Sequence, residues 1–380
     1  MFYILYWLSA GLLLLGTVGY PVVLWLWPKS RTQKTVTSPN DLPKVSIILP
    51  CFNEENFIGK KINNLLNLDY PPEKLEIVLV SDGSTDRTEV IIDLFLSHPQ
   101  LKFISLPERG GKPKALNQGV AAASGDILVF SDTRQQFNPD CLLQLVPNFS
   151  DKKVGGVSGT LIDYTTKNRV KAAGSGKRSW LAMWFRDSEN KIKVMESRIH
   201  SVVGVYGALY AIRRELYTPL PADIILDDMQ VPFDAIRKGY RVVFEPKAMA
   251  VEDSKSHLDM EVSRRERIFT GKIQFLFRNK NLFNPRRNPV FMQLFLHKYV
   301  RLLFPFLLLL LFISNLFIND NGFYQYTLLL QMLFYALCLL GLAFKSPSVF
   351  YLFSRFNISV VQGFYAYLIK SYSVKWPKQV

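Results

Sequence analysis

The feature that most constrains this chain is its uncharged N-terminus, because no side chain from Met1 to Pro28 carries a charge. The stretch from Phe2 to Trp27 is long enough to cross the roughly 30 Å hydrocarbon core of a bilayer as a helix. A cleaved signal peptide needs a basic start, a shorter apolar core and a small-residue cleavage site, and none of these is clear here. We therefore predict that residues 1–28 form a retained transmembrane anchor.

Two further uncharged runs lie near the C-terminus. They extend from Leu302 to Asn319 and from Asn321 to Phe344, and the polar residues between them favour a turn. This pair predicts a helical hairpin through the membrane. The next segment, 348–369, is interrupted by polar residues. It either crosses the membrane, against the preference of basic residues for the cytoplasmic side, or lies partly in the interface.

Basic residues flank the uncharged runs and predict their orientation. Lys29 and Arg31 follow the first run, Arg301 precedes the second, and Lys345 follows the third. Positive flanks are retained on the cytoplasmic side of a membrane. We therefore predict an integral protein of the inner or plasma membrane, whose large central domain faces the cytoplasm.

The formal net charge of +15 is explained by where the basic residues lie. Much of the excess is in the juxtamembrane segment 257–301, so the lipid bilayer is its simplest partner. No aromatic-basic strand module is present, which argues against nucleic acid as a partner. Three distant cysteines and four histidines also exclude a structural zinc site.

The central residues alternate short β-rich runs with helical patterns, which indicates an α/β domain with a mostly parallel sheet. The predicted strands are 44–49, 75–80, 127–130 and 241–244. The predicted helices are 54–68, 86–96, 114–123 and 139–145. The predicted organisation is an anchor (1–28), the α/β domain (40–256), a basic juxtamembrane or interfacial segment (257–301), a membrane hairpin with a third membrane-associated helix (302–370) and a tail (371–380).

Polar side chains follow three of the predicted strands. In an open parallel sheet, ligands bind beyond the carboxyl ends of the strands. The three strands lead into Pro50-Cys51-Phe52-Asn53-Glu54-Glu55, Ser81-Asp82-Gly83-Ser84-Thr85-Asp86 and Ser131-Asp132-Thr133-Arg134. Asp86 and Glu54 also stand where a helix start favours an acid. The carboxylate of Asp82, just before Gly83, can accept a hydrogen bond from a base or a sugar.

These segments, together with Gly111-Lys112-Pro113-Lys114-Ala115-Leu116-Asn117, resemble a family 2 glycosyltransferase with the GT-A fold, which is Rossmann-like. The resemblance covers residues 44 to about 270. It implies binding of a nucleotide, commonly UDP, by Pro50, Asn53, Glu54 and Asp82. It also implies that Lys112 lies near the diphosphate, which suits a compact ammonium group. Without these neighbours, a solvated surface lysine would be the simpler interpretation.

In this family a D-x-D motif holds a divalent cation on the diphosphate of the sugar nucleotide. The motif corresponds here to Asp132-Thr133-Arg134, so the resemblance implies Mg²⁺ or Mn²⁺ bound by Asp132. Arginine cannot coordinate a metal at the third position, but magnesium can bind through one carboxylate, substrate phosphates and water. We predict that Arg134 itself neutralises phosphate charge.

A second acidic motif, Ile225-Leu226-Asp227-Asp228-Met229, resembles the family motif whose second acid is the general base. The resemblance implies an inverting transfer with Asp228 as that base. A helix cap is the alternative role for Asp228, although Asp227 could cap and leave its neighbour free. Residues 204–211, just upstream, resemble the loop that flanks the acceptor.

A third segment, Arg264-Arg265-Glu266-Arg267-Ile268, resembles the Q-x-x-R-W motif of processive family members. Arg267 matches the arginine that meets the leaving diphosphate, while Ile268 replaces the tryptophan that stacks on the acceptor sugar. This replacement argues against a synthase that extrudes a long polymer. A basic residue facing lipid is the alternative interpretation of Arg267.

The resemblance therefore implies a membrane-bound hexosyl- or N-acetylhexosaminyltransferase. It would move a sugar from a nucleotide sugar to a polysaccharide or lipid-linked acceptor. One alternative is a transferase acting on polyprenyl phosphate. Another is a catalytically weakened membrane scaffold that only binds a nucleotide, which Arg134 and Ile268 favour.

Overall fold

The computed structural model describes residues 1–28, 42–163, 180–252, 258–318, 322–344 and 348–374. The chain divides into two compact units. One unit comprises Met1–Leu26 and Ser256–Tyr372, and the other comprises Trp27–Lys255 and Ser373–Val380.

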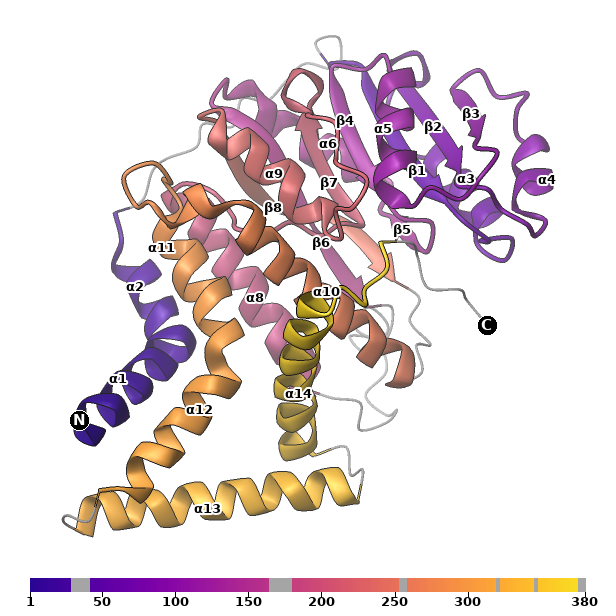
Figure 1. Cartoon of the computed structure of the whole chain (residues 1–380). Coiled ribbons are helices and arrows are strands. Elements are labelled where there is room, and N and C mark those ends of the chain that lie inside the picture. Colours follow the sequence, from indigo (N-terminus) through magenta and orange to yellow (C-terminus); the bar gives the residue numbers. More distant parts are fainter. Residues whose placement is uncertain (29–41, 164–179, 253–257, 319–321, 345–347, 375–380) are drawn as a thin grey trace. The chain divides into compact units, whose positions relative to one another are not determined.

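The second unit is built on a sheet of eight strands, whose order is β3-β2-β1-β4-β7-β6-β8-β5 (Figure 1). The strands are β1 (Val45–Cys51), β2 (Leu75–Ser81), β3 (Leu101–Ser105), β4 (Ile127–Ser131), β5 (Gln135–Phe137), β6 (Val154–Asp163), β7 (Leu209–Arg213) and β8 (Arg241–Glu252). Strand β7 runs antiparallel to β4 and β6, and β5 runs antiparallel to β8, while the other pairs are parallel. The predicted α/β fold with a mostly parallel sheet is confirmed.

Strand β1 lies between β2 and β4 and is buried along its whole length. Ile47 and Leu49 belong to the core cluster that includes residues of α3 and α6. Ile48 points to the other face, where α5 comes so close that a Cβ on Gly119 would lie 2.7 Å from its Cγ2. A strand covered on both faces is mostly apolar, as β1 is apart from Ser46, which explains why it was predicted from sequence.

The helices of this unit fill the gaps between the strands. They are α3 (Ile58–Leu66), α4 (Thr88–Asp93), α5 (Lys112–Ala122), α6 (Cys141–Leu145), α8 (Trp180–Ile199) and α9 (Asp227–Arg237). Short 3₁₀ turns cover Pro72–Lys74, Val146–Ser150 and Arg214–Leu216. The helix predicted from residue 54 begins only at Ile58, because Glu54 starts a turn in which its carbonyl accepts from the N–H groups of Phe57 and Ile58.

The first unit is helical. Its elements are α1 (Phe2–Leu14), a π-helical turn (Leu15–Gly19), α2 (Tyr20–Leu26), α10 (Leu258–Arg278), a 3₁₀ turn (Lys280–Phe283), α11 (Phe291–Gln293), a π-helical stretch (Leu294–Tyr299), α12 (Val300–Leu316), α13 (Gly322–Ala343) and α14 (Val349–Leu368). Within the described residues, three stretches are long and apolar enough to cross a membrane: Phe2–Leu26, Phe291–Leu316 and Gly322–Ala343. They correspond to the three uncharged runs, although the second begins before its predicted start.

Some predictions about the membrane segments fall on residues outside the described ranges. These are the turn at residues 319–321 and the basic flanks Lys29, Arg31 and Lys345. Helix α14 covers the segment 348–369, for which the sequence analysis left open whether it crosses the membrane. This helix packs on α10. A Cβ on Gly363 would lie 2.8 Å from Phe269 Cβ, so a glycine allows these two helices to approach closely.

Candidate functional site

The tips of β1 and β2 are tied together by Asn53. Its backbone N–H donates to Ser84 Oγ at 3.2 Å, and its Oδ1 accepts from Thr85 N at 2.8 Å. The φ angle of 52° at Asn53 is in the left-handed region, where asparagine is more frequent than most residues. Pro50 is buried within β1, opposite Val80 of β2. Pro50 and Asn53, which were predicted to contact the nucleotide, therefore lie at the carboxyl end of β1, beside the end of β2.

Asp82 is fully buried and holds the loop before α5. Its Oδ1 accepts from Gly110 N and its Oδ2 from Gly111 N, both at 2.7 Å. Gly111 has φ +91°, a conformation that L side chains rarely adopt. We expected the carboxylate of Asp82 to be available to a base or sugar at the strand tip. The structure gives it a positioning role that sequence reasoning missed, and the expected contact with the nucleotide stays a prediction.

Lys112 begins α5 and lies between two acids from distant parts of the chain. Its Nζ is 2.9 Å from Asp132 Oδ1 and 3.4 Å from Asp227 Oδ1. Burial by itself lowers the pKa of Lys112, but the charges of Asp132 and Asp227 outweigh it and hold that pKa well above its usual range. With its side chain only 11% exposed, Lys112 is a buried cation and not a solvated surface lysine.

The two acids at the start of α9 differ in their surroundings. Asp227 is buried, and besides Lys112 it faces Tyr210, whose hydroxyl donates to Asp227 Oδ2 at 3.4 Å. The N-cap position belongs to Leu226, so Asp227 does not occupy the cap that we considered for it. Asp228 is half-buried and faces Gly207, where a Cβ would lie 3.3 Å from its Oδ2.

The loop predicted to flank the acceptor therefore lies directly beside Asp228. Val205 N–H donates to the Asp228 carbonyl at 3.4 Å. Helix α8 supports this loop, because Lys193 Nζ donates to the Gly204 carbonyl at 2.8 Å and lies 3.9 Å from the centre of the Tyr206 ring. Sequence analysis did not predict α8, and its contacts with the loop join residues that no motif connects.

Arg134 lies against the first strand tip. Its Nε is 3.2 Å from Glu54 Oε2, and its guanidinium lies 4.7 Å from the centre of the Phe57 ring. Within the described residues, no cluster of three or more His, Cys, Asp or Glu side chains is placed to hold a metal. Asp132, 38% exposed, is the one acid of the D-x-D-like motif, which fits a metal held jointly with a substrate.

Arg267 belongs to the helical unit, where it lies on α10 with Arg264 and Arg265. Its predicted contact with the diphosphate stays a prediction.

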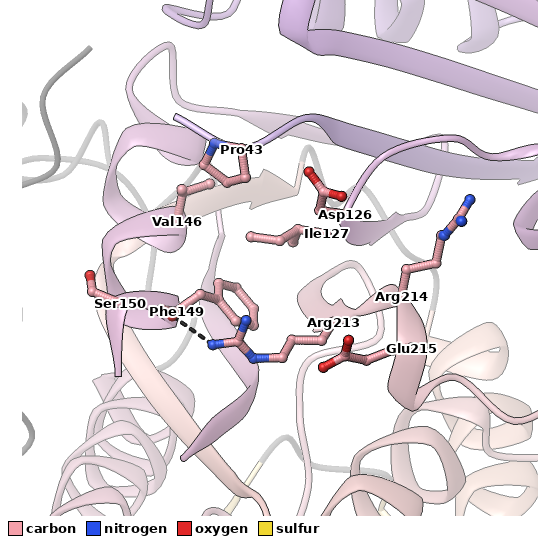
Figure 2. A pocket seen from close by; sticks show the side chains of 9 residues that line it. All are labelled: Pro43, Asp126, Ile127, Val146, Phe149, Ser150, Arg213, Arg214 and Glu215. Carbon is pink, nitrogen blue, oxygen red and sulfur yellow. Dashed lines mark hydrogen bonds between the residues drawn. The ribbon is translucent and has the colours of Figure 1, made fainter. Parts of the chain in front are cut away.

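A cavity of about 470 Å³ opens at the opposite end of the strands. Figure 2 shows Arg213 donating to the Phe149 carbonyl, at 2.6 Å, on its wall. Its lining residues are Pro43, Asp126, Ile127, Val146, Phe149, Ser150, Arg213, Arg214 and Glu215. Pro43 and Asp126 precede β1 and β4, so this cavity lies at their amino ends and does not belong to the acidic site.

The sheet is mostly parallel, and Lys112 and Asp227 meet Asp132 just beyond the carboxyl end of β4, an arrangement that resembles the GT-A class of nucleotide-sugar-dependent glycosyltransferases. Residues 46–217 match the family model described as Glycosyl transferase family 2. Over residues 46–217 the chain is therefore similar to family 2 glycosyltransferases, in agreement with the resemblance found in its sequence.

The fold is similar to that of the mannosyltransferase PcManGT from Pyrobaculum calidifontis, solved in complex with GDP-Man and Mn²⁺. The TM-score is 0.70 at 22% identity, over 97% of this chain and 100% of that chain. At this identity the likeness shows the fold.

Many curated relatives match parts of the chain, and two of them show the range. A poly-beta-1,6-N-acetyl-D-glucosamine synthase from Staphylococcus aureus is 28% identical over 224 residues, 58% of this chain and 52% of the relative. A beta-monoglucosyldiacylglycerol synthase from Nostoc sp. is 34% identical over 154 residues, 40% of this chain and 33% of the relative. The chain thus spans about half the length, or less, of the curated relatives it matches.

Proposed function

We propose that this protein transfers a sugar from a nucleotide sugar, with UDP as the nucleotide, to a polysaccharide or lipid-linked acceptor with inversion at the sugar. The observation that carries the proposal is the cluster of Asp132, Lys112, Asp227 and Asp228 at the carboxyl edge of a domain similar to family 2 glycosyltransferases. The names of the two curated relatives support a polymeric or lipid acceptor.

The general base in this proposal is Asp228. An inverting transfer needs a group that takes the proton of the acceptor hydroxyl as that oxygen attacks the sugar. Asp228 is half-buried beside Gly207, and a glycine leaves more room for an acceptor than any other residue. Asp227 is engaged by Lys112 and Tyr210, so it suits a role in positioning and not in proton transfer.

The diphosphate in this proposal is neutralised by several groups. A divalent cation, Mg²⁺ or Mn²⁺, would supply positive charge to the leaving group when bound, with Asp132 as its protein ligand. Lys112 keeps its charge because Asp132 and Asp227 raise its pKa, so it remains a cation at neutral pH. Arg134 and Arg267 are the further cations that we assign to this task.

The test is a screen of the full chain in lipid nanodiscs against a panel of radiolabelled nucleotide sugars. We expect one UDP-sugar to label a product with wild-type protein, and Asp228→Asn to lose that label. A polymeric product would support a polysaccharide acceptor. A single lipid-linked sugar would favour transfer to a lipid, including polyprenyl phosphate. Nucleotide binding without transfer to any acceptor class would support the weakened scaffold and contradict the proposal.

We further propose that the catalytic unit faces the cytoplasm, where nucleotide sugars are made. The apolar stretches and the basic residues beside them support this orientation. After replacement of the three native cysteines, Gly322→Cys should react with an impermeant thiol reagent applied outside intact cells, whereas Lys44→Cys should not. Reaction at residue 44 alone would reverse the topology.

A further inference from the structure

Strand β5 is a three-residue strand at the edge of the sheet, and it pairs only with β8. An edge strand presents backbone groups with no strand to pair with. Here two side chains of α3 take that place. Asn64 Oδ1 accepts from Phe137 N at 2.7 Å, and Asn64 Nδ2 donates to the Phe137 carbonyl at 2.8 Å. Lys61 Nζ donates to the carbonyl of Gln135.

Lys61 is an unusual residue for this task. Its side chain is fully buried, and its Nζ lies 3.8 Å from the centre of the Phe137 ring. Across the described part of the chain, no carboxylate lies within ion-pair distance of it, and burial lowers its pKa to about 7. An amine buried without a counter-ion is unfavourable compared with an apolar side chain of similar size. Stability alone therefore gives no reason for a lysine here.

The segment that Lys61 holds leads directly out of the D-x-D-like motif. Gln135 follows Arg134 and comes three positions after Asp132. The opposite end of the same segment is held by Glu54, whose Oε2 is 3.2 Å from Arg134 Nε. The chain from Glu54 to Asn64 therefore contacts residues 134–137 at three places, through the side chains of Glu54, Lys61 and Asn64.

These contacts connect two parts of the candidate site. Asn53 and Glu54 belong to the β1 tip, which we assign to the nucleotide, and Asp132 belongs to the loop that we assign to the diphosphate and its metal. Because both parts are attached to α3, they are expected to move as one body. A fixed distance between them suits a ligand that spans both.

We propose that Lys61 is a positioning residue of the candidate site, which fixes the backbone at Gln135 so that Asp132 keeps its place relative to Asn53 and Glu54. This inference rests on the proposed function for the identity of the ligand. The contacts between α3 and β5 do not depend on the proposed function.

The test compares Lys61→Met with Lys60→Met in the full-length protein in nanodiscs. Methionine fills a similar volume without a donor for the Gln135 carbonyl, and Lys60 is the exposed neighbour on the same helix. We expect faster hydrogen exchange at residues 133–137 in ligand-free Lys61→Met. We also expect an affinity for UDP with Mn²⁺ that is about tenfold to hundredfold weaker, the range found when groups that orient the ligands of a metal are lost. Lys60→Met should change neither.

Failure of this inference can be distinguished from failure of the proposed function. If Lys61→Met lowers the melting temperature but leaves both the exchange at 133–137 and the UDP affinity unchanged, its role is only structural and the inference is wrong. If wild-type protein binds no nucleotide, the proposed function fails, while the exchange comparison still decides whether Lys61 fixes the loop. Should Lys61→Met not fold, Lys61→Gln keeps a shorter donor and should show the same changes in smaller measure; unchanged exchange and affinity there would overturn the inference.

Discussion

Lys112 Nζ lies 2.9 Å from Asp132 Oδ1 and links this acid to Asp227, whose Oδ1 is 3.4 Å away on its other side. The two acids come from the end of β4 and the start of α9, so one buried cation joins elements that are distant in sequence. The arrangement also divides the acidic pair of α9. Asp227 is engaged by Lys112, whereas Asp228 faces Gly207.

The first prediction follows from this division of roles. Asp228→Asn should preserve folding and nucleotide affinity while lowering turnover by about 10²- to 10⁴-fold, because an amide of the same shape cannot accept the proton. Asp227→Asn is the matched variant. It removes a charge beside Lys112, so it should weaken stability and nucleotide affinity as well as turnover. Turnover and UDP affinity of both variants decide this, and near-normal turnover of Asp228→Asn would place the base elsewhere.

The second prediction concerns Asp82. Asp82→Ala should release the N–H groups of Gly110 and Gly111 and loosen the loop that delivers Lys112 to the site. Each lost hydrogen bond to a charged group contributes about 1.5–3 kcal/mol, so we expect lower stability and a clear loss of nucleotide affinity by calorimetry. Asp93→Ala, at an exposed acid of α4, is the control. Equal affinities of wild type and Asp82→Ala would show that this loop does not serve the nucleotide.

Sequence reasoning identified the strands whose surroundings leave their composition no freedom. Strands β1, β2 and β4 are buried along their whole length. Each is a mostly apolar run that ends in polar residues, with Ser46 in β1 and Glu76 in β2 as buried polar exceptions. Strand β3 is partly exposed at the sheet edge, and β5 has only three residues. Neither has a clear pattern, and both were missed for that reason. Strands β6 and β7 were missed as well, and the first three residues of β7 belong to the segment 204–211 that we expected to be a loop.

The contacts within the site could not be predicted in the same way. Asp82 binds residues 28 and 29 positions further along the chain, and its motif gives no indication of them. Lys61 reads as a polar position on an amphipathic helix, yet it is fully buried because its ammonium group finds a carbonyl of β5. Such roles depend on which elements become neighbours, and this follows from the order of strands across the sheet.

The third prediction is a loss of stability in acid centred on Glu76. Its Oε1 is 2.6 Å from Lys102 Nζ, and it accepts hydrogen bonds from Ser124 and Ser46. Desolvation raises the pKa of Glu76, but these partners outweigh it and lower the pKa from 4.5 to about 2. Because the folded pKa is below the unfolded value, the stabilisation is fully present above about pH 4.5 and is lost as the pH falls towards 2.

Thermal unfolding between pH 2 and pH 7 measures this effect in the nanodisc-embedded protein. The contribution at neutral pH is up to about 3 kcal/mol, reduced because Lys102 is 49% exposed. Glu76→Gln should be less stable at pH 7 and should lose less stability than wild type between pH 4.5 and 2. Glu73→Gln, at an exposed position, should keep the wild-type pH dependence. Parallel profiles for wild type and Glu76→Gln would assign the acid sensitivity to other groups.

The last prediction concerns Arg134, which stands where the resembling motif usually has a metal-binding acid. Its Nε is 3.2 Å from Glu54 Oε2, so this cation is held at the site edge by an ion pair. If it shares the neutralisation of the diphosphate with a metal, chelation should lower wild-type activity only in part. Stabilising the charge of a leaving group contributes strongly to the rate enhancement in such sites. We therefore expect Arg134→Ala to be strictly metal-dependent or inactive.

Arg134→Asp completes the test, because it restores the carboxylate and should strengthen the requirement for a divalent ion. Activity with and without EDTA, and a Mn²⁺ titration of each variant, measure this. Arg87→Ala, at an exposed arginine near the same strand tips, should behave as wild type. Complete loss of wild-type activity in EDTA, with no effect of Arg134→Ala, would reduce Arg134 to a structural partner of Glu54. Asp132 and the substrate phosphates would then hold the metal without its help.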